Sequence, residues 1–501
     1  MTMKGDLNKW QGIEQEFRIG ISSIQTFRKS LSCKSQVQPQ EVHEYAIRIF
    51  NALKEYKFFD ERPAIIYSAK NFNGFMRNGS RIYLCDSLPE IATPECRNAF
   101  ELLKYDKASE FHMQIAVEEL NKQLKEKKEK IVIQCWKANT ELKPDFTRGT
   151  HENYSIDVRK FKKDCLIPFL ILKPIFFGAG GYVSERVSDF SALKEIIEKA
   201  KYVMSPKAMA TRRVYGGGGS RKHSLFSIRG ISNLRIHVDA GEGLRSEVAR
   251  LLNNAITSYV IQAIESGKID KVEGIEDPIG TFMALSRNIE GDWKIRLKNG
   301  ERVNALDYLN STYIDALDKL FEERENSYWD IYALKTFKEL HTKLEKGLHE
   351  DSFVFTRIEW LMKLHVIEKE ILEGFEYEGE GKEGEKERKI GACFDFSNLC
   401  EHDLYESVAD KIGAERILRE EDIGEALLYP PEKSRALLRN SLIEEIVKFQ
   451  PENLLVRWNR IINPPTRDEE VIFDELEGWD EEKIKKKLEE AKRFCMNRHL
   501  A

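Results

Sequence analysis

The 501-residue sequence has no long hydrophobic run, few prolines and no excess of basic residues. Its most apolar window, residues 165–179, is interrupted by Pro168, Lys173 and Pro174. A transmembrane helix, which needs about 18 consecutive apolar residues, is therefore not expected. The net charge of −5 provides no global basic surface for nucleic acid. We expect neither a membrane nor a nucleic-acid partner.

The cysteines indicate neither a disulfide framework nor a standard zinc motif. The eight cysteines are scattered, without a CxxC pair or a Cys/His spacing typical of zinc ligation. The first ten residues, MTMKGDLNKW, lack the apolar segment of a signal peptide. We therefore expect reduced thiols and a cytoplasmic protein.

Glycine-rich nucleotide-binding motifs are also missing. The segment GAGG at 178–181 is neither GxGxxG nor a Walker A motif, because no Lys-Ser/Thr pair follows it. Glycine at these positions instead predicts close backbone approach or a positive φ. The segments 215–224 and 376–389, one glycine-rich and one highly charged, are typical of a flexible connector and a solvated insertion.

The length and the alternation of strand and helix patterns predict an α+β protein of two domains. Amphipathic helices are expected at 40–57, 96–124, 190–204 and 246–266. We predict one antiparallel sheet with helices packed behind it and acidic residues on its open face. The predicted division is a large domain, residues 1–428, and a small C-terminal domain, residues 429–501.

The segment NGSRIYLCDSLPEIATPE, residues 78–95, predicts the functional strand. Side chains two apart in a strand share a face, so a cation, a phenol and a thiol should lie together, opposite an apolar face. The polar face holds Arg81, Tyr83 and Cys85, and the apolar face holds Ile82 and Leu84. Carboxylates and a hydroxyl follow: Asp86, Glu90, Thr93 and Glu95. Anionic oxygens at this density favour a bound divalent cation, with an ordinary surface strand as the alternative.

Further strands carry polar residues with the same spacing. Residues 11–19 place Glu14 and Glu16 on one face, which is either a metal-binding face or a solvated one. In THENYSI, residues 150–156, His151 and Glu152 are a candidate metal or substrate pair, or a structural histidine and its neighbour. Two later strands contribute Arg229, and Arg235 with His237 on one face, and a helix at 430–440 carries Arg435 and Arg439 four residues apart.

Taken together and in order, these segments resemble one family. They are GIEQEF (12–17), NGSRIYL and PEIATPE (78–95), YDKASE (105–110), THENY (150–154), GAG (178–180), RIHV (235–238), PPEKSRALLR (430–439) and the segment around Trp458. This order is similar to that of the Pup ligase and Pup deamidase/depupylase family, which is proteasome accessory factor A-like. The family belongs to the carboxylate–amine ligase superfamily and is related to glutamine synthetase. The resemblance implies a glutamine synthetase-like antiparallel sheet that forms a cradle for ATP and Mg²⁺.

Site residues follow from the resemblance by motif position. Glu14 and Glu90 would bind Mg²⁺ with the oxygen of Tyr83, and Glu16 and His237 are further candidates. Nucleotide contacts would come from the set Arg81, Thr93, Trp458, Arg229, Arg235, Arg435 and Arg439, with Trp458 near the adenine. The family's reaction would form an amide or isopeptide bond: a glutamate side-chain carboxylate attacks ATP, and an amine displaces phosphate from the acyl phosphate. An aspartate near the metal ligands would take the proton of the amine.

The sequence departs from the family pattern at this aspartate. Cys85 occupies its position, Asp86 follows, and Leu88 stands where the family has a histidine. Either a β-bulge turns Asp86 into the site as the base, or Cys85 lies in the pocket as a nucleophile for amide cleavage or as an inert residue. Between Arg229 and Arg235 the chain has only GISN, where the family has a longer acidic run containing histidine.

The partners and the direction of the reaction are therefore open at the level of sequence. The carboxylate donor would be a protein or peptide tail ending in Glu or Gln, or a small amino acid, and an amine would be the acceptor. The leading hypothesis is an ATP- and Mg²⁺-dependent ligase. The alternatives are a deamidase or isopeptidase of the same fold and a nucleotide-binding scaffold without catalysis.

Overall fold

The computed structural model describes most of the chain. The described residues are 9–23, 39–69, 71–137, 139–185, 193–216, 223–230, 234–371, 384–448, 455–462, 470–476 and 478–496. The expected connector at 215–224 and the expected insertion at 376–389 fall largely outside these ranges. No helix among the described residues is long and apolar enough to cross a membrane.

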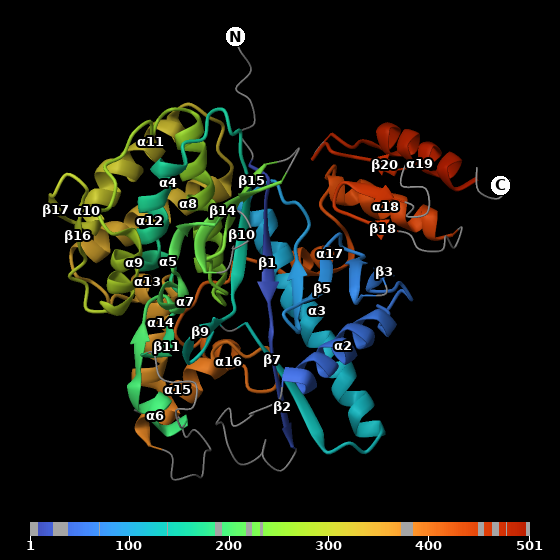
Figure 1. Ribbon diagram of the computed structural model, residues 1–501, viewed down its shortest axis with the longest axis horizontal. Coiled ribbons are helices and arrows are strands. Elements are labelled where there is room, and N and C mark those ends of the chain that lie inside the picture. Colours follow the sequence, from blue (N-terminus) through green and yellow to red (C-terminus); the bar gives the residue numbers. More distant parts are fainter. Residues whose placement is uncertain are drawn as a thin grey trace.

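A nine-stranded sheet runs through the centre of the molecule (Figure 1). Its strands, from one edge to the other, are β13 (Arg213–Tyr215), β14 (Ser224–Arg229), β15 (Arg235–Val238), β10 (Thr150–Ser155), β1 (Gln11–Glu16), β6 (Leu88–Ala92), β5 (Arg81–Cys85), β4 (Asn73–Met76) and β3 (Ile65–Ala69). Neighbours pair antiparallel except β13 and β14, which are parallel. The α+β class and the sheet cradle are thus confirmed.

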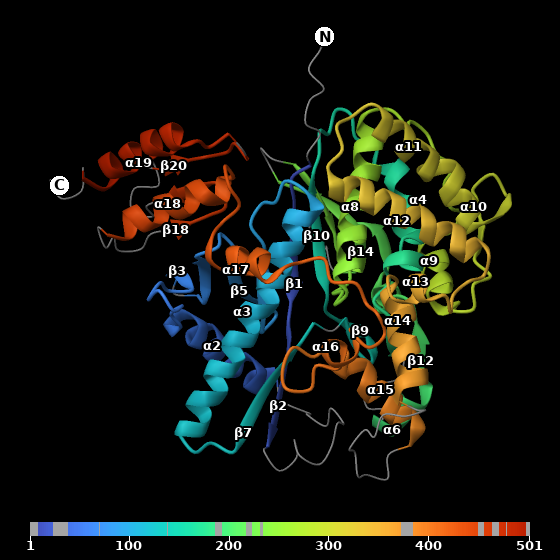
Figure 2. The ribbon, with the colours of Figure 1, turned by 180° about the vertical axis from the view of Figure 1, so that it is seen from behind.

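Helices cover one face of this sheet and leave the other open. The long helices α2 (Pro39–Glu55), α3 (Ala99–Glu126) and α8 (Glu247–Glu265) are central to this layer, and α3 lies behind β1 in Figure 1 and in front of it in Figure 2. Ile82 and Ile91 are completely buried and belong to the same apolar cluster as residues of α2 and α3. The apolar side of the functional strand therefore faces the core, as its alternation predicted.

The remaining helices pack mostly beside β14 and β15. They are α4 (Lys163–Leu172), α5 (Pro174–Phe177), α6 (Leu193–Lys199), α7 (Pro206–Ala210), α9 (Pro278–Arg287), α10 (Ala305–Leu309), η1 (Asn310–Ile314), α11 (Asp315–Glu322), α12 (Tyr328–Glu345), α13 (Ser352–Phe355), α14 (Glu359–His365), η2 (Val366–Ile371), α15 (Glu385–Asp395), α16 (Leu404–Val408) and α17 (Glu420–Leu428). Of these, α17 packs on α3 instead.

Small two-stranded sheets complete the large lobe. They pair β2 (Arg18–Ser23) with β7 (Ile131–Trp136), β8 (Thr140–Glu141) with β9 (Lys143–Thr147), β11 (Gly181–Ser184) with β12 (Ala200–Val203), and β16 (Lys294–Arg296) with β17 (Arg302–Asn304).

The prediction of a helix over residues 190–204 is wrong in its second half. Helix α6 ends at Lys199, and residues 200–203 form β12, in which Tyr202 pairs with Tyr182 of β11. The two rings pack edge to face with centroids 5.4 Å apart, so tertiary packing overrides local helix propensity. The close approach expected at GAGG is confirmed, because Gly180 has a φ of +66° and a Cβ there would lie 2.9 Å from Cα of Trp360.

The C-terminal residues form their own layer beside β3 and β4. It contains α18 (Arg435–Val447), α19 (Glu481–Met496) and a sheet of β18 (Leu455–Val456), β19 (Arg460–Ile462) and β20 (Glu470–Ile472). Their apolar side chains make a separate cluster around Leu438, Leu442 and Ile443 that also includes Phe75 of β4. This supports the predicted boundary at residue 429, which stays a prediction.

A buried ion pair fastens this layer to the sheet. Glu95, just after β6, accepts from Arg435 Nη2 at 2.7 Å and from Arg439 Nη1 at 3.1 Å. Arg439 is fully buried and also donates to the carbonyls of Gly79 and Trp458, both at 2.9 Å. Burial would raise the pKa of Glu95, but Arg439 and Arg435 together hold it at about 2. The two arginines predicted to share a helix face therefore bind this carboxylate.

Replacing Arg439 by methionine should destabilise the protein strongly, because the buried Glu95 carboxylate then keeps only Arg435 as a charged partner. We expect a loss of about 3–5 kcal/mol in the free energy of unfolding, measured by chemical denaturation. The half-exposed pair of Arg460 and Glu470 supplies the matched control, since Arg460→Met should cost about 1 kcal/mol or less. Equal effects of the two substitutions would contradict the role of Glu95.

The pH dependence of stability provides a second readout of the same pair. The pKa of Glu95 is lowered on folding from 4.5 to about 2. Its contribution is therefore fully present above pH 4.5 and is lost as the pH falls through about 2. In Arg439→Met, the loss of unfolding free energy between pH 4.5 and pH 2 should be smaller than in the unmodified protein, as measured by chemical denaturation across this pH range.

Candidate functional site

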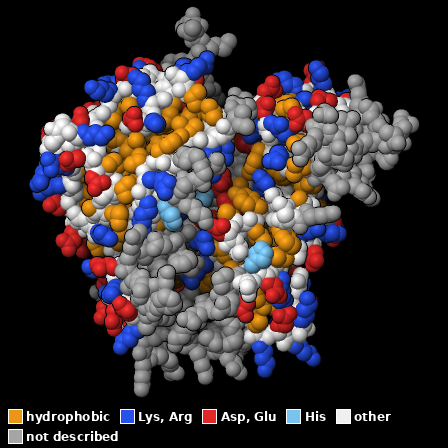
Figure 3. Space-filling view, viewed as in Figure 1, with side chains coloured by type: hydrophobic (Ala, Val, Ile, Leu, Met, Phe, Trp, Pro, Cys, Tyr) orange, Lys and Arg blue, Asp and Glu red, His pale blue; other side chains and the backbone are white. Residues whose placement is uncertain are grey.

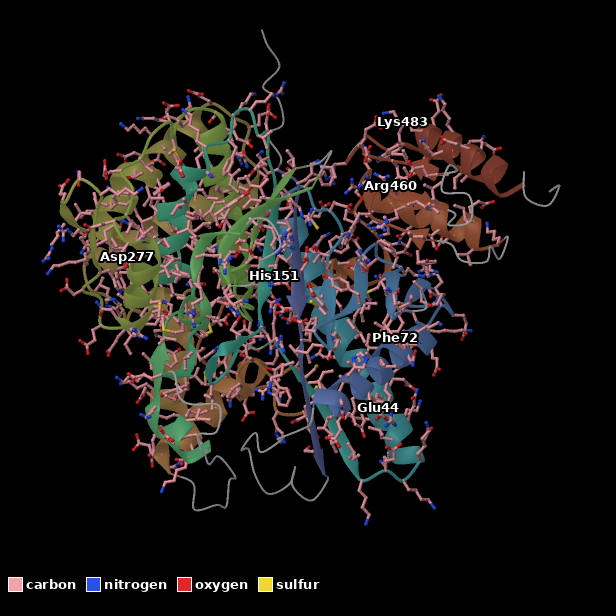
Figure 4. The ribbon with its side chains drawn as sticks, viewed as in Figure 1. Glu44, Phe72, His151, Asp277, Arg460 and Lys483 are labelled. Carbon is pink, nitrogen blue, oxygen red and sulfur yellow. The ribbon has the colours of Figure 1, made fainter. Side chains whose placement is uncertain are left out.

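The open face of the sheet gathers polar side chains from adjacent strands. The registers place Glu14 opposite His151, and Glu16 opposite Glu90, which in turn lies opposite Tyr83. Acidic and histidine side chains reach the surface near the middle of this face in Figure 3, and Figure 4 shows His151 at the centre of the sheet. Glu14 and Glu16 share this face, as predicted, while Ile13 and Phe17 are buried on the other.

Glu14 lies among four nitrogen-bearing side chains. Its carboxylate oxygens are 3.9 Å from His151 Nδ1, His237 Nδ1 and Arg235 Nη2. It also accepts from Asn153 Nδ2 at 3.2 Å. Burial opposes ionisation of Glu14, but the contact with His151 and the charge of His237 lower its pKa below the usual value. Glu14 therefore stays a carboxylate at neutral pH.

His237 is held rigidly beside Glu14. The side chain is completely buried, with Nδ1 3.0 Å from Asn153 Oδ1 and Nε2 3.1 Å from Asp239 Oδ1. Burial lowers the pKa of His237 to about 4. A neutral imidazole is the form that can bind a metal ion.

A second group surrounds Glu90. The Tyr83 hydroxyl donates to Glu90 Oε1 at 2.6 Å. The ligating atoms of Glu16, Cys85 and Glu90 all lie within 4.8 Å of one another. Burial raises the pKa of Glu90 to about 7, and burial together with the charge of Glu90 raises the pKa of Cys85 to about 12. The Cys85 thiol is thus protonated near neutral pH and is a weak base and nucleophile.

The expected β-bulge at Asp86 is absent. The β5–β6 pairing is regular from Arg81 opposite Ala92 to Cys85 opposite Leu88. Asp86 and Ser87 form a two-residue turn with φ values of +44° and +71°, which is the backbone of a type I′ hairpin. Asp86 is therefore exposed at the turn, while Cys85 lies on the polar face. The two-residue turn joins the strands without an inserted residue. No bulge therefore turns Asp86 into the site, as its role as a base would require.

A pocket lies between the sheet and the C-terminal layer. Its cavity volume is about 160 Å³, and it opens to solvent. The residues that line it include Glu14, Thr93, Arg235, Arg435 and Trp458. The pocket therefore brings side chains of the sheet and of the C-terminal layer together.

Several predicted nucleotide contacts surround this pocket with defined partners. The Thr93 hydroxyl accepts from the Ile13 amide at 3.0 Å and so joins β1 to the end of β6. Arg81 donates to Asn73 Oδ1 at 2.8 Å, and its guanidinium lies 6.0 Å from the ring centroid of Trp458. Trp458 packs edge to face on Phe75 at 5.5 Å.

The other arginines differ in how close they are to the pocket. Arg229 donates to Asp239 Oδ1 at 2.9 Å, Arg235 donates to Asn153 Oδ1 at 2.7 Å, and Arg435 binds Glu95. Arg235 and Arg435 line the pocket, whereas Arg229 does not.

Two residues of this site, Asn153 and Asp239, were not singled out as ligands or contacts in the sequence. Asn153 and Asp239 connect Glu14, His237 and Arg229 by hydrogen bonds and ion pairs. Asn153 is two residues after His151, and Asp239 two after His237, so the same alternation could have identified them. Glu152 points to the opposite face, where Lys173 binds it at 2.7 Å, so His151 alone belongs to the site.

Comparisons with known proteins identify the family of the chain. Residues 9–462 match the family model described as Pup-ligase protein. The chain is 26% identical to a Pup--protein ligase of Kribbella flavida over 94% of this chain and 97% of that protein. It is 24% identical to the Pup--protein ligase of Paenarthrobacter aurescens over 86% of this chain and 88% of that protein.

Solved structures support the fold. The structure of Pup in complex with its ligase PafA matches with a TM-score of 0.77 and 21% identity, covering 98% of this chain and 94% of that chain. PafA in complex with ADP matches with a TM-score of 0.71 and 20% identity, covering 91% and 94%. Since the family model covers nearly the whole sequence, the chain belongs to the Pup-ligase protein family.

Proposed function

We propose that this protein is an ATP- and Mg²⁺-dependent ligase that joins a glutamate side-chain carboxylate to an amine. The carboxylate would come from the tail of a Pup-like protein. The observation that supports this most is the convergence of carboxylates from β1 and β6 beside a pocket lined by Glu14, Arg235 and Trp458. Membership in a ligase family and the names of the relatives support the ligase direction over the hydrolase and scaffold alternatives.

The residues present fit a hard divalent cation. Glu14, Glu90 and Tyr83 would supply oxygen ligands from three neighbouring strands, with Glu16 and His237 as further candidates. Two of these carboxylates are oriented by hydrogen bonds: Glu90 by the Tyr83 hydroxyl, and Glu14 by Asn153. When bound, such a cation neutralises phosphate oxygens and stabilises charge that develops during phosphoryl transfer.

The nucleotide would lie in the pocket between the sheet and the C-terminal layer. Trp458 would pack against the base, while Arg81 and Arg235 would face the phosphates, with Thr93 and Arg435 at the pocket wall. Because Arg435 already binds Glu95, its main effect would be to position the wall.

Removal of the proton from the acceptor amine is the step for which this chain lacks the aspartate that the family resemblance implies. The thiol of Cys85 stays protonated, and Asp86 lies at an exposed turn. We therefore propose that an amine acceptor reacts in the fraction already neutral in solution, with the sheet residues orienting the activated carboxylate rather than removing the proton.

The function is tested by release of ADP from ATP in the presence of Mg²⁺ and a Pup-like peptide ending in glutamate. With an amine acceptor, ADP and amide should form together. Without a base, the rate should rise about tenfold per pH unit until the amine is neutral, near pH 10.4 for lysine. ADP release independent of both peptide and amine, or amine release without ADP, would contradict the ligase.

The cation ligand assignment is tested by Glu14→Gln. Removal of this charge should weaken Mg²⁺-dependent binding of an ATP analogue roughly 10–100-fold in calorimetric titration. Glu44→Gln is the matched control, because Glu44 is exposed on α2, far from the site (Figure 4). Unchanged affinity in Glu14→Gln with Mg²⁺ present would refute the assignment.

A further inference from the structure

Cys135 and Cys400 form a pair of thiols in the apolar cluster behind the sheet, where α2 and α3 also pack. Their sulfur atoms lie 3.7 Å apart, although the two residues are 265 positions apart in the sequence. Of the six free cysteines whose side chains the structure describes, only these two have their sulfurs in contact. The fold therefore brings together two groups that can form a covalent bond with each other.

Hydrogen bonds of the backbone hold this pair in place. The segment that follows α15 runs antiparallel to the end of β7, with Asn398 paired with Trp136. The Leu399 amide donates to the Cys135 carbonyl at 3.0 Å. The Cys135 amide also donates to the Cys400 sulfur at 3.4 Å. The contact between the two sulfurs thus depends on paired backbones and not on flexible side chains alone.

The two thiols differ in their access to solvent. Cys135 is completely buried, whereas Cys400 is half-buried and is followed by the exposed residues Glu401 and His402. The hydrogen bond with Cys400, together with burial, raises the pKa of the Cys135 thiol well above its usual value. An oxidant that arrives from solvent therefore meets Cys400 first, and Cys135 is the protonated thiol directly behind it.

We propose that Cys400 and Cys135 are an oxidation site at which hydrogen peroxide forms a reversible disulfide within the chain. The Cys400 sulfur attacks one peroxide oxygen and the O–O bond breaks. That oxygen stays on Cys400 as a sulfenic acid, and the other leaves with the thiol proton as water. The Cys135 sulfur then attacks the Cys400 sulfur: the S–S bond forms, the S–O bond breaks, and the hydroxyl leaves with the Cys135 proton as a second water. Two thiols are oxidised, one peroxide is reduced to two waters, and a dithiol reductant reverses the change.

The sulfurs need only a small further approach. A disulfide bond is about 2.05 Å long, so two sulfurs 3.7 Å apart must close by about 1.7 Å. Rotation about the Cα–Cβ bonds supplies movements of this size. Cys400 also lies in a bend just after the paired residues, so its backbone can adjust without breaking the strand pairing.

The disulfide ties the connection between α15 and α16 to β7. This connection is otherwise held by Arg245, which donates to the Asn398 carbonyl and pairs with Asp403 at 2.7 Å. The cross-link closes a loop of 265 positions, and the stabilisation that a disulfide provides grows with the length of the loop. Oxidation therefore stabilises the folded chain. This inference does not rest on the proposed ligase activity.

Peptide mapping after peroxide treatment tests the site on the full chain. The reduced, folded protein is treated with hydrogen peroxide, and the remaining thiols are alkylated in denaturant before digestion. We expect a linked pair of peptides that contains Cys135 and Cys400, and we expect dithiothreitol to restore both thiols. The oxidised protein should also unfold at a higher denaturant concentration than the reduced protein.

Serine variants separate the roles of the two thiols. In Cys135→Ser, peroxide should leave a sulfenic acid on Cys400 that dimedone traps, because the second thiol is missing. Cys400→Ser should form no such disulfide and should lose the shift in the denaturation midpoint. Circular dichroism confirms that each variant is folded.

Cys165→Ser is the matched control. Cys165 is buried in α4 and its thiol donates to the Asp270 carbonyl at 3.6 Å, a bond that a serine hydroxyl can also make. This variant should form the disulfide and show the same shift in the midpoint as the unmodified protein.

A Cys400 thiol that survives excess peroxide, a disulfide that links other cysteines in place of this pair, or an oxidised protein no more stable than the reduced one would overturn the proposal. None of these measurements depends on ADP formation. The ligase proposal can therefore fail while the disulfide forms, and the disulfide can be absent from an active ligase.

Discussion

The mutual repulsion of carboxylates held on one sheet face is the constraint on which this site depends. Glu14, Glu16 and Glu90 come from two adjacent strands whose other faces are locked into the core, so they cannot separate without breaking the sheet. Such crowding is stable only when positive charge lies among the carboxylates. Histidines and Arg235 supply part of it beside Glu14, and a divalent cation would supply the rest.

The rest of the fold keeps these groups in place. Helices α3 and α8 pack behind the sheet. In the buried interior, Lys137 donates to Asp106 of α3 at 2.7 Å. On the other side, Glu95 and its two arginines attach the C-terminal layer, which carries Trp458 to the pocket. Catalysis in such a site would come mainly from positioning and electrostatics, with little movement of the protein.

Much of this arrangement could be predicted from sequence, because strand alternation is a local property. The faces of Glu14, Glu16, Tyr83 and Cys85 follow from a period of two, and the antiparallel sheet with helices behind it follows from the order of elements. Tertiary partners could not be predicted in this way. That Arg435 and Arg439 bind Glu95, or that residues 200–203 leave a helix to pair with β11, depends on contacts between distant segments.

The turn at Asp86 shows the limit of motif transfer. The sequence left Cys85 and Asp86 as alternative site residues, and only the hairpin geometry decides which of these two neighbours faces the site. Two residues with positive φ close the hairpin, so Asp86 leaves the polar face and Cys85 remains on it. The polar face at this end of β5 therefore carries the Cys85 thiol instead of the Asp86 carboxylate.

Anomalous diffraction from crystals grown with Mn²⁺ and a non-hydrolysable ATP analogue would locate the cation and the nucleotide together. We expect a manganese peak bounded by Glu14, Glu90 and Tyr83, with the analogue in the pocket beside Trp458. A nucleotide bound elsewhere, or these side chains free of metal at saturating Mn²⁺, would contradict the proposed site.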